Sequence, residues 1–76
     1  MDIQTKIIEI VAQICMTEVS NISVESSIGD FPGWDSMGHL SILRQVEEEF
    51  NINFDPEEMM DIEDVSDIIN TAKTKL

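Results

Sequence analysis

The apolar residues of this chain recur at helical spacing in three segments, which lie at about residues 2–16, 36–50 and 62–75. Apolar residues three or four positions apart fall on one face of an α-helix. In the first segment this face consists of Ile3, Ile7, Ile10, Val11 and Ile14. No pair of strand-like segments is joined by a hairpin signal. The pattern therefore predicts an all-α fold.

The size of the chain narrows this prediction. With 76 residues it is expected to form a single domain, residues 1–76. Domains this small need disulfides, a metal or an efficient helical core, because one core supplies only a few kcal/mol of net stability. One cysteine, Cys15, excludes an internal disulfide, and one histidine leaves too few ligands for a Cys/His zinc site. Cys15 lies beside the first apolar stripe and is expected to be a buried filler.

Capping signals give the helix boundaries in the first two thirds of the chain. Asp2 is a suitable N-cap for the first helix, and Asp35 for a second helix over residues 36–50. Asn51 is suited to the C-cap of that second helix. Its apolar stripe is expected to be Met37, Leu40, Leu43, Val46 and Phe50.

Two further helices are predicted after residue 54. Asp55 followed by proline begins a short helix over residues 56–60. Asp61 is expected to cap the last helix, over residues 62–75, with Asp64 completing a capping box. The fold class is thus a four-helix bundle of three main helices and one short helix, with a long loop after the first.

That long loop covers residues 17–34, and its scattered apolar residues are expected to hold it across the open end of the bundle. They are Ile22, Val24, Ile28 and Phe31. Trp34 is expected to anchor the loop in the core, and the alternative is that it shapes the approach to Ser36.

The charge of the chain limits its partners. It has 16 acidic and 4 basic residues, and a formal net charge of -12. Nucleic acid and anionic membranes are therefore poor partners, whereas basic protein surfaces are good ones. The alternative is that the acidity only keeps a small protein soluble and monomeric. No apolar run approaches the roughly 18 residues of a membrane span, and no signal peptide is evident, so a cytoplasmic monomer without membrane insertion is expected.

Ser36 is the residue with the clearest chemical potential. It begins the second helix, where its hydroxyl is expected to be exposed, either as a cap or as a handle that another enzyme modifies. Asp35 can do the capping instead. His39 lies one turn further on, but a Ser-His nucleophile needs a positioned acid and an oxyanion site, and no Gly-x-Ser-x-Gly elbow surrounds Ser36. Independent catalysis is therefore not expected. Gly38 costs about 1 kcal/mol of helix propensity, which indicates a close approach.

Asp35-Ser36-Met37 resembles the Asp-Ser-Leu signature of acyl carrier proteins, and residues 46–52 and 61–69 resemble segments of their second and fourth helices. The resemblance covers nearly the whole chain. It implies an acyl-carrier-like bundle with 4'-phosphopantetheine attached to Ser36, between Asp35 and Met37. A phosphopantetheinyl transferase would donate the arm from coenzyme A. Acyl or aminoacyl groups would then be loaded on its thiol as thioesters, and the protein itself would not be an enzyme.

The resemblance also implies that the second helix docks on basic surfaces of loading and transferring enzymes, with His39, Glu47 and Glu48 as recognition residues. Gly38, His39 and Ser41 leave the front of this helix less acidic than in fatty-acid carriers. This difference favours a dedicated pathway, such as polyketide, modified-sugar or aminoacyl transfer, over housekeeping fatty acid biosynthesis.

The resemblance also implies that the apolar face of the second helix, with Met59, Met60 and Ile68 opposite, can open to shelter an acyl chain. Core filling is the favoured interpretation of the two methionines. Two other functions are alternatives. An acidic protein–protein interaction module would share the charge but would carry no prosthetic group. A calcium-binding module would need a characteristic acidic loop with a glycine and a late glutamate, and no stretch fits that pattern.

Overall fold

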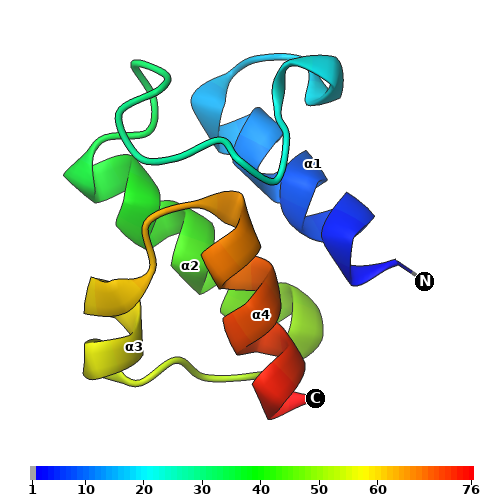
Figure 1. Cartoon of the computed structure of the whole chain (residues 1–76), viewed down its shortest axis with the longest axis vertical. Coiled ribbons are helices and arrows are strands. Elements are labelled where there is room, and N and C mark those ends of the chain that lie inside the picture. Colours follow the sequence, from blue (N-terminus) through cyan, green and yellow to red (C-terminus); the bar gives the residue numbers. More distant parts are fainter. Residues whose placement is uncertain (1) are drawn as a thin grey trace.

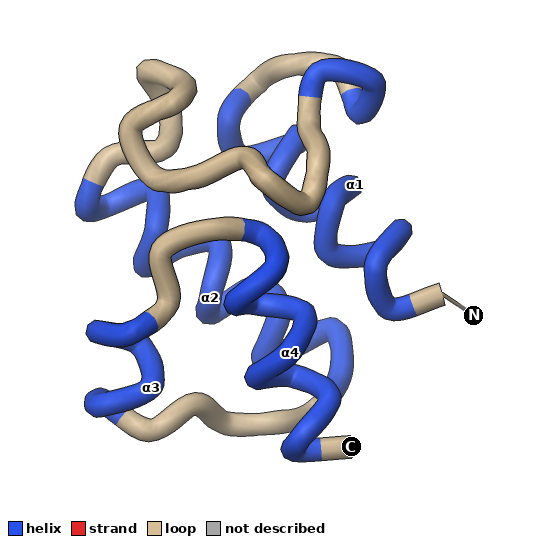
Figure 2. Tube along the Cα trace, in the orientation of Figure 1, coloured by secondary structure: helices blue, strands red, loops and turns tan. Residues whose placement is uncertain are grey.

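The computed structural model describes residues 2–76, and in this part of the chain it shows four α-helices and one short 3₁₀ helix (Figure 1). They are α1 (Ile3–Cys15), η1 (Val19–Asn21), α2 (Ser36–Phe50), α3 (Pro56–Asp61) and α4 (Val65–Lys75). The helix α1 packs against both α2 and α4. Helices and loops make up the whole described trace (Figure 2). The predicted all-α bundle, with one short helix and a long loop after the first, is confirmed.

The core lies where α1, α2 and α4 meet, and the long loop contributes to it. Its largest fully buried side chains are Trp34, Ile7, Ile42, Leu43, Ile68, Val11, Val46 and Val65. Trp34 is therefore a core anchor, as the first of its two interpretations predicted. Cys15 is also buried, and burial raises the pKa of its thiol. A neutral thiol in such a place is a small apolar filler.

The helix α2 has the predicted bounds, and of its predicted apolar stripe Leu43 and Val46 are buried and Phe50 packs against the core, but the other two residues are exposed. Met37 is 80% exposed and Leu40 is 43% exposed, so they do not belong to the core stripe. The residues of α2 that are buried are Ile42, Leu43 and Val46. Because Trp34 fills the core beside the first turn, half-buried His39 occupies the inward position there. Periodicity alone did not show which apolar residues of α2 are buried, since apolar residues lie on both sides of the buried stripe.

The predicted start of α4 is also wrong. Asp61 is the last residue of α3 and not a cap, and α4 begins three residues later than expected, at Val65. Its N-cap is Asp64, whose Oδ1 accepts from the Asp67 amide at 2.7 Å. The Glu63 amide in turn donates to Asp67 Oδ2 at 3.1 Å. Two aspartates three residues apart suit a capping box in either register, so local sequence did not distinguish them.

Contacts with the long loop decide which aspartate caps α4. The Ile28 amide donates to the Glu63 carbonyl at 3.0 Å, and the Val65 amide donates to the Ser26 carbonyl at 2.9 Å. These two bonds hold the residues before α4 in an extended conformation, and the second satisfies a first-turn amide that the helix itself leaves unpaired. The loop is thus fastened to the start of α4 at one end and, through Trp34, to α2 at the other.

Candidate functional site

Ser36 is the first residue of α2, and it is exposed. The preceding residue does the capping, because the Gly38 amide donates to Asp35 Oδ1 at 2.8 Å. No described residue forms a hydrogen bond with the Ser36 hydroxyl. The hydroxyl is therefore open to solvent and available for modification, and a change of this side chain leaves the cap of α2 in place.

The start of α2 is fixed by close backbone packing. A Cβ atom on Gly38 would overlap the carbonyl oxygen of Gly33, and a Cβ on Gly33 would lie 2.9 Å from the Cα of Cys15. The first turn of α2 thus rests on the loop, and the loop rests on the end of α1. The close approach expected at Gly38 is present, and its partner is the chain's own backbone. This contact holds Ser36 in a defined position relative to the core.

Trp34 and His39 form a second contact across the start of α2. The indole Nε1–H of Trp34 donates to His39 Nδ1 at 2.9 Å, and the two rings are stacked with centroids 6.2 Å apart. The carbonyl of Trp34 accepts from the Gly29 amide at 2.8 Å. His39 is half-buried against the core tryptophan. The lone tryptophan and histidine of the chain meet beside Ser36.

The three glutamates at the end of α2 have three different surroundings. Glu47 Oε2 accepts from the Phe54 amide at 2.7 Å, so this carboxylate holds the loop between α2 and α3. Glu48 is exposed. Glu49 lies 3.7 Å from the ammonium group of Lys6 on α1. Of the two glutamates expected to recognise partners, only Glu48 has a carboxylate that the fold does not use.

The short helix α3 is joined to the end of α4 by charge. Lys75 Nζ lies 2.7 Å from Glu58 Oε1 and 3.9 Å from Asp55 Oδ2. Glu58 Oε1 also accepts from the Asp55 amide at 2.8 Å. The hydrogen bond from Lys75 lowers the pKa of Glu58, and the same bond raises the pKa of Lys75. These contacts fasten a helix that is too short to be stable alone.

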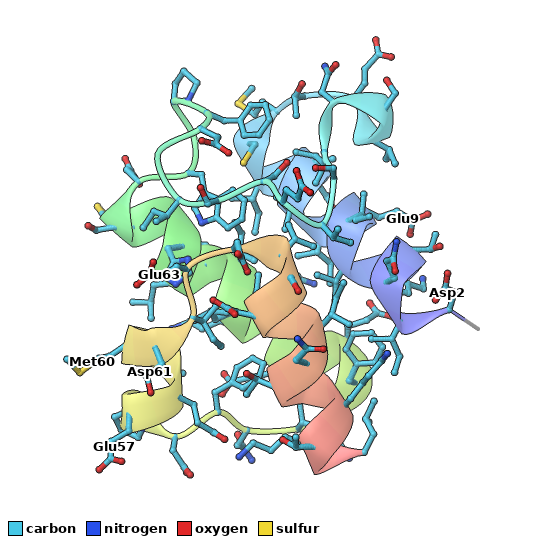
Figure 3. All side chains as sticks on the ribbon, viewed as in Figure 1. Asp2, Glu9, Glu57, Met60, Asp61 and Glu63 are labelled. Atoms are coloured by element: carbon cyan, nitrogen blue, oxygen red, sulfur yellow. The ribbon has the colours of Figure 1, made fainter. Side chains whose placement is uncertain are left out.

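The residues considered for sheltering an acyl chain do not form an apolar chamber. Ile68 is fully buried, Met59 packs against the core, and Met60 is 81% exposed on α3. Figure 3 shows Met60 pointing away from the body of the protein, beside Glu57 and Asp61. A groove of about 320 Å³ does lie between α3 and α4, but mostly polar side chains line it. Core filling is therefore the role of Ile68 and Met59, whereas the core-filling prediction is wrong for the exposed Met60.

Two further features bear on function. Within residues 2–76, no helix is both long and apolar enough to cross a membrane. Over the same residues, no three His, Cys, Asp or Glu side chains are placed to hold a metal ion together.

The surroundings of Ser36 fit a phosphodiester. The backbone amides of Ser36 and Met37 belong to the first turn of α2 and donate to no described residue. First-turn amides and the helix dipole favour an anion at this position. The nearest acid, Asp35, already accepts from Gly38. The residues present therefore supply an exposed hydroxyl, free donors and space for an attached anionic group.

A small helical domain that displays one exposed serine at a helix start has the form of a carrier, a protein that holds a group for other proteins to act on. Residues 5–72 match the family model described as a phosphopantetheine attachment site. The chain belongs to the acyl carrier protein family, whose members are carriers and not catalysts.

Individual relatives agree with the family match. The chain is 31% identical over 72 residues to an acyl carrier protein of Rickettsia bellii strain RML369-C, covering 95% of this chain and 84% of that protein. It is 32% identical over 68 residues to an acyl carrier protein of Clostridium acetobutylicum, covering 90% of this chain and 88% of that protein. Both similarities cover at least 90% of this chain and therefore include the start of α2.

The sequence predicted the position of Ser36 at the start of a helix and its cap at Asp35, but it did not predict two contacts that shape the site. The pairing of Trp34 with His39 and the backbone contact of Gly33 with Gly38 both join residues five positions apart across a helix start. The single weak signal for them was the glycine inside the first turn.

Proposed function

We propose that Ser36 is the residue that carries 4'-phosphopantetheine. The observation that supports this most directly is an exposed hydroxyl at a helix start whose capping is already done by Asp35. Other serines are less suited. The hydroxyls of Ser23, Ser26 and Ser27 form hydrogen bonds within the long loop. Ser36 combines exposure, a free hydroxyl and a setting that favours a phosphodiester.

The proposed modification is a transfer from coenzyme A. The Ser36 oxygen attacks the phosphorus that bears the pantetheine part, an oxygen–phosphorus bond forms there, and the phosphoanhydride bond of coenzyme A breaks. The nucleotide part leaves, and the hydroxyl proton passes to a base of the transferase. The bound arm then supplies a thiol that holds acyl groups as thioesters. The chain's own contribution is to hold Ser36 still on a rigid helix start.

Membership of the family implies a phosphopantetheinyl transferase and carrier-dependent enzymes as partners. We propose that they dock along α2. Beside Ser36, α2 exposes two apolar side chains, Met37 and Leu40, and an exposed acid, Glu48, lies at the far end of the helix. A basic partner surface would be attracted to the acidic end and would bury the apolar side chains. The recognition roles of Glu47 and His39 stay predictions.

We also propose that this carrier serves a dedicated pathway. The first two turns of α2 contain no acid after Ser36, and they present Met37, Leu40 and Ser41 to solvent. Fatty-acid partners that depend on acids at these positions would therefore bind this chain weakly. Efficient loading and elongation of the holo protein by housekeeping fatty-acid enzymes would contradict this part of the proposal. A cytoplasmic location and a monomeric state stay predictions.

Mass spectrometry tests the attachment site. Incubation with coenzyme A and a broad-specificity transferase should add the mass of one phosphopantetheine to the native chain and to Ser41→Ala, which removes an exposed hydroxyl from the same helix. Ser36→Ala should remain unmodified while keeping its helical circular dichroism, since the Asp35 cap is intact. Modification of Ser36→Ala, or none of the native chain with any such transferase, would refute the proposal. The second result would instead favour an acidic interaction module without a prosthetic group.

A further inference from the structure

The hydrogen bond between Trp34 and His39 fixes where the proton of the imidazole lies. The indole nitrogen can only donate, so His39 Nδ1 must be the acceptor in the 2.9 Å contact. In a neutral imidazole one nitrogen accepts and the other carries the proton. Neutral His39 therefore has its N–H at Nε2, on the opposite edge of the ring from Trp34.

This Nε2–H group is not buried. No described residue forms a hydrogen bond with it, and none of the buried side-chain nitrogen or oxygen atoms of the described residues lacks a partner. Every buried side-chain nitrogen or oxygen atom of these residues thus has a hydrogen-bond partner. His39 Nε2 has none, so this atom is not buried. The fold thus holds one edge of the ring in the core and leaves a donor of fixed position at the surface.

The spacing along α2 makes the side chain of His39 a neighbour of that of Ser36. His39 follows Ser36 by three residues on α2, and side chains at that spacing are neighbours on a helix surface. Helical side chains also lean toward the helix N-terminus, so the imidazole extends over the turn that contains Ser36. The bond to Trp34, which precedes the helix, keeps it there. The adjacent acid, Asp35, is turned to the Gly38 amide.

We propose that His39 binds the phosphodiester of the arm, with its Nε2–H donating to a phosphate oxygen attached through Ser36. The inference rests on the proposed attachment at Ser36. His39 is then a positioning residue, which limits the directions in which the arm leaves the helix. Trp34 acts through it, because the indole selects the tautomer that presents the donor outward.

Nuclear magnetic resonance tests this directly, since the chain has a single histidine and a single tryptophan. In the unmodified protein, ¹⁵N spectra should show neutral His39 protonated at Nε2. In the modified protein, cross-peaks should join the imidazole protons to the first methylene group of the arm. The phosphodiester ³¹P resonance should shift in His39→Asn, whose side-chain oxygen can still accept from Trp34 but which has no donor at the far edge.

Trp34→Phe is the matched variant on the other side of the contact. It keeps an aromatic ring in the core but removes the indole donor, so both His39 tautomers should appear and the ³¹P resonance should move toward that of His39→Asn. A Nδ1–H tautomer in the native protein, or a modified protein without the cross-peaks, would overturn the inference while leaving attachment intact. Absence of any mass gain would refute the attachment and the inference together. The native spectra decide the matter even if a variant does not fold.

Discussion

Replacement of Gly38 by alanine should destabilise this protein, although helix propensity alone predicts the opposite. Alanine is favoured over glycine by about 1 kcal/mol inside a helix. In this structure the change in stability has the opposite sign, because the new Cβ would overlap the Gly33 carbonyl oxygen. That oxygen is a backbone atom and cannot rotate away as a side chain would. Overpacking of this kind costs about 1–3 kcal/mol, and an unyielding backbone contact belongs at the upper end of that range.

The expected net loss for Gly38→Ala is therefore about 1–2 kcal/mol in the free energy of unfolding, which lowers the melting temperature by about 4–8 °C per kcal/mol in a domain this small. Ser41→Ala is the matched control, because Ser41 is exposed on the same helix. It should gain a few tenths of a kcal/mol from propensity alone. Urea unfolding followed by circular dichroism measures both changes.

The relief of the overlap should also affect the function. Gly33 lies against Cys15 at the end of α1, so the loop cannot retreat, and the first turn of α2 must move or fray. We expect Gly38→Ala to be modified more slowly by a transferase than Ser41→Ala under the same conditions. A Gly38→Ala protein that is as stable as the native chain, or more stable, would show that the backbone contact does not constrain the site.

Two further predictions concern the acidic residues. Glu47→Ala leaves the amide of Phe54 unpaired and should cost about 1–3 kcal/mol of stability, whereas Glu48→Ala should leave stability within about 0.5 kcal/mol of native and slow association with basic partners. Urea unfolding and stopped-flow binding separate these effects. The lowered pKa of Glu58 means that its contact with Lys75 stabilises the fold above the usual carboxyl pKa and is lost as pH falls through the lowered value. Lys75→Met should remove this part of the acid dependence in thermal melts. The raised pKa of Lys75 makes the same contact disappear as pH rises through that raised value.

Each of these predictions has a clear contrary result. Equal destabilisation by Glu47→Ala and Glu48→Ala would mean that the bond to the Phe54 amide contributes little. An unchanged acid dependence in Lys75→Met would mean that Glu58 is not stabilised by the lysine in solution, as can happen for exposed ion pairs. In that case α3 would be held by its apolar contacts alone.

Local patterns predicted most of the helices. The bounds of α2 and the N-cap at Asp2 follow from residues that lie next to one another, since capping and periodicity are local effects. The start of α4 could not be predicted in this way. Asp61 and Asp64 are equally good caps, and the choice between them depends on the bond that the Ser26 carbonyl accepts and the bond that the Ile28 amide donates, more than thirty residues earlier in the chain.

The candidate site likewise has some features that local sequence predicts and others that depend on tertiary contacts. Ser36 and its cap could be found from the sequence, because Asp35-Ser36 at a helix start is a local signal. The exposure of Met37 and Leu40 and the inward position of His39 could not, since they depend on where Trp34 fits in the core. Likewise, the sequence could not tell that Glu47 serves the fold and Glu48 does not, because only folding brings the Phe54 amide to one of them.

By itself the sequence determined that this chain forms a small acidic helical domain with a serine at the start of its second long helix, since each of these properties is set by composition or by neighbours along the chain. That the domain is a carrier was implied only by the resemblance of its motifs to those of acyl carrier proteins. Tertiary structure decided how that serine is presented. The contacts of Trp34 with His39 and of Gly38 with Gly33 depend on the loop folding back over α1 and α2. Such contacts arise from close packing in three dimensions, for which a linear pattern holds no local signal.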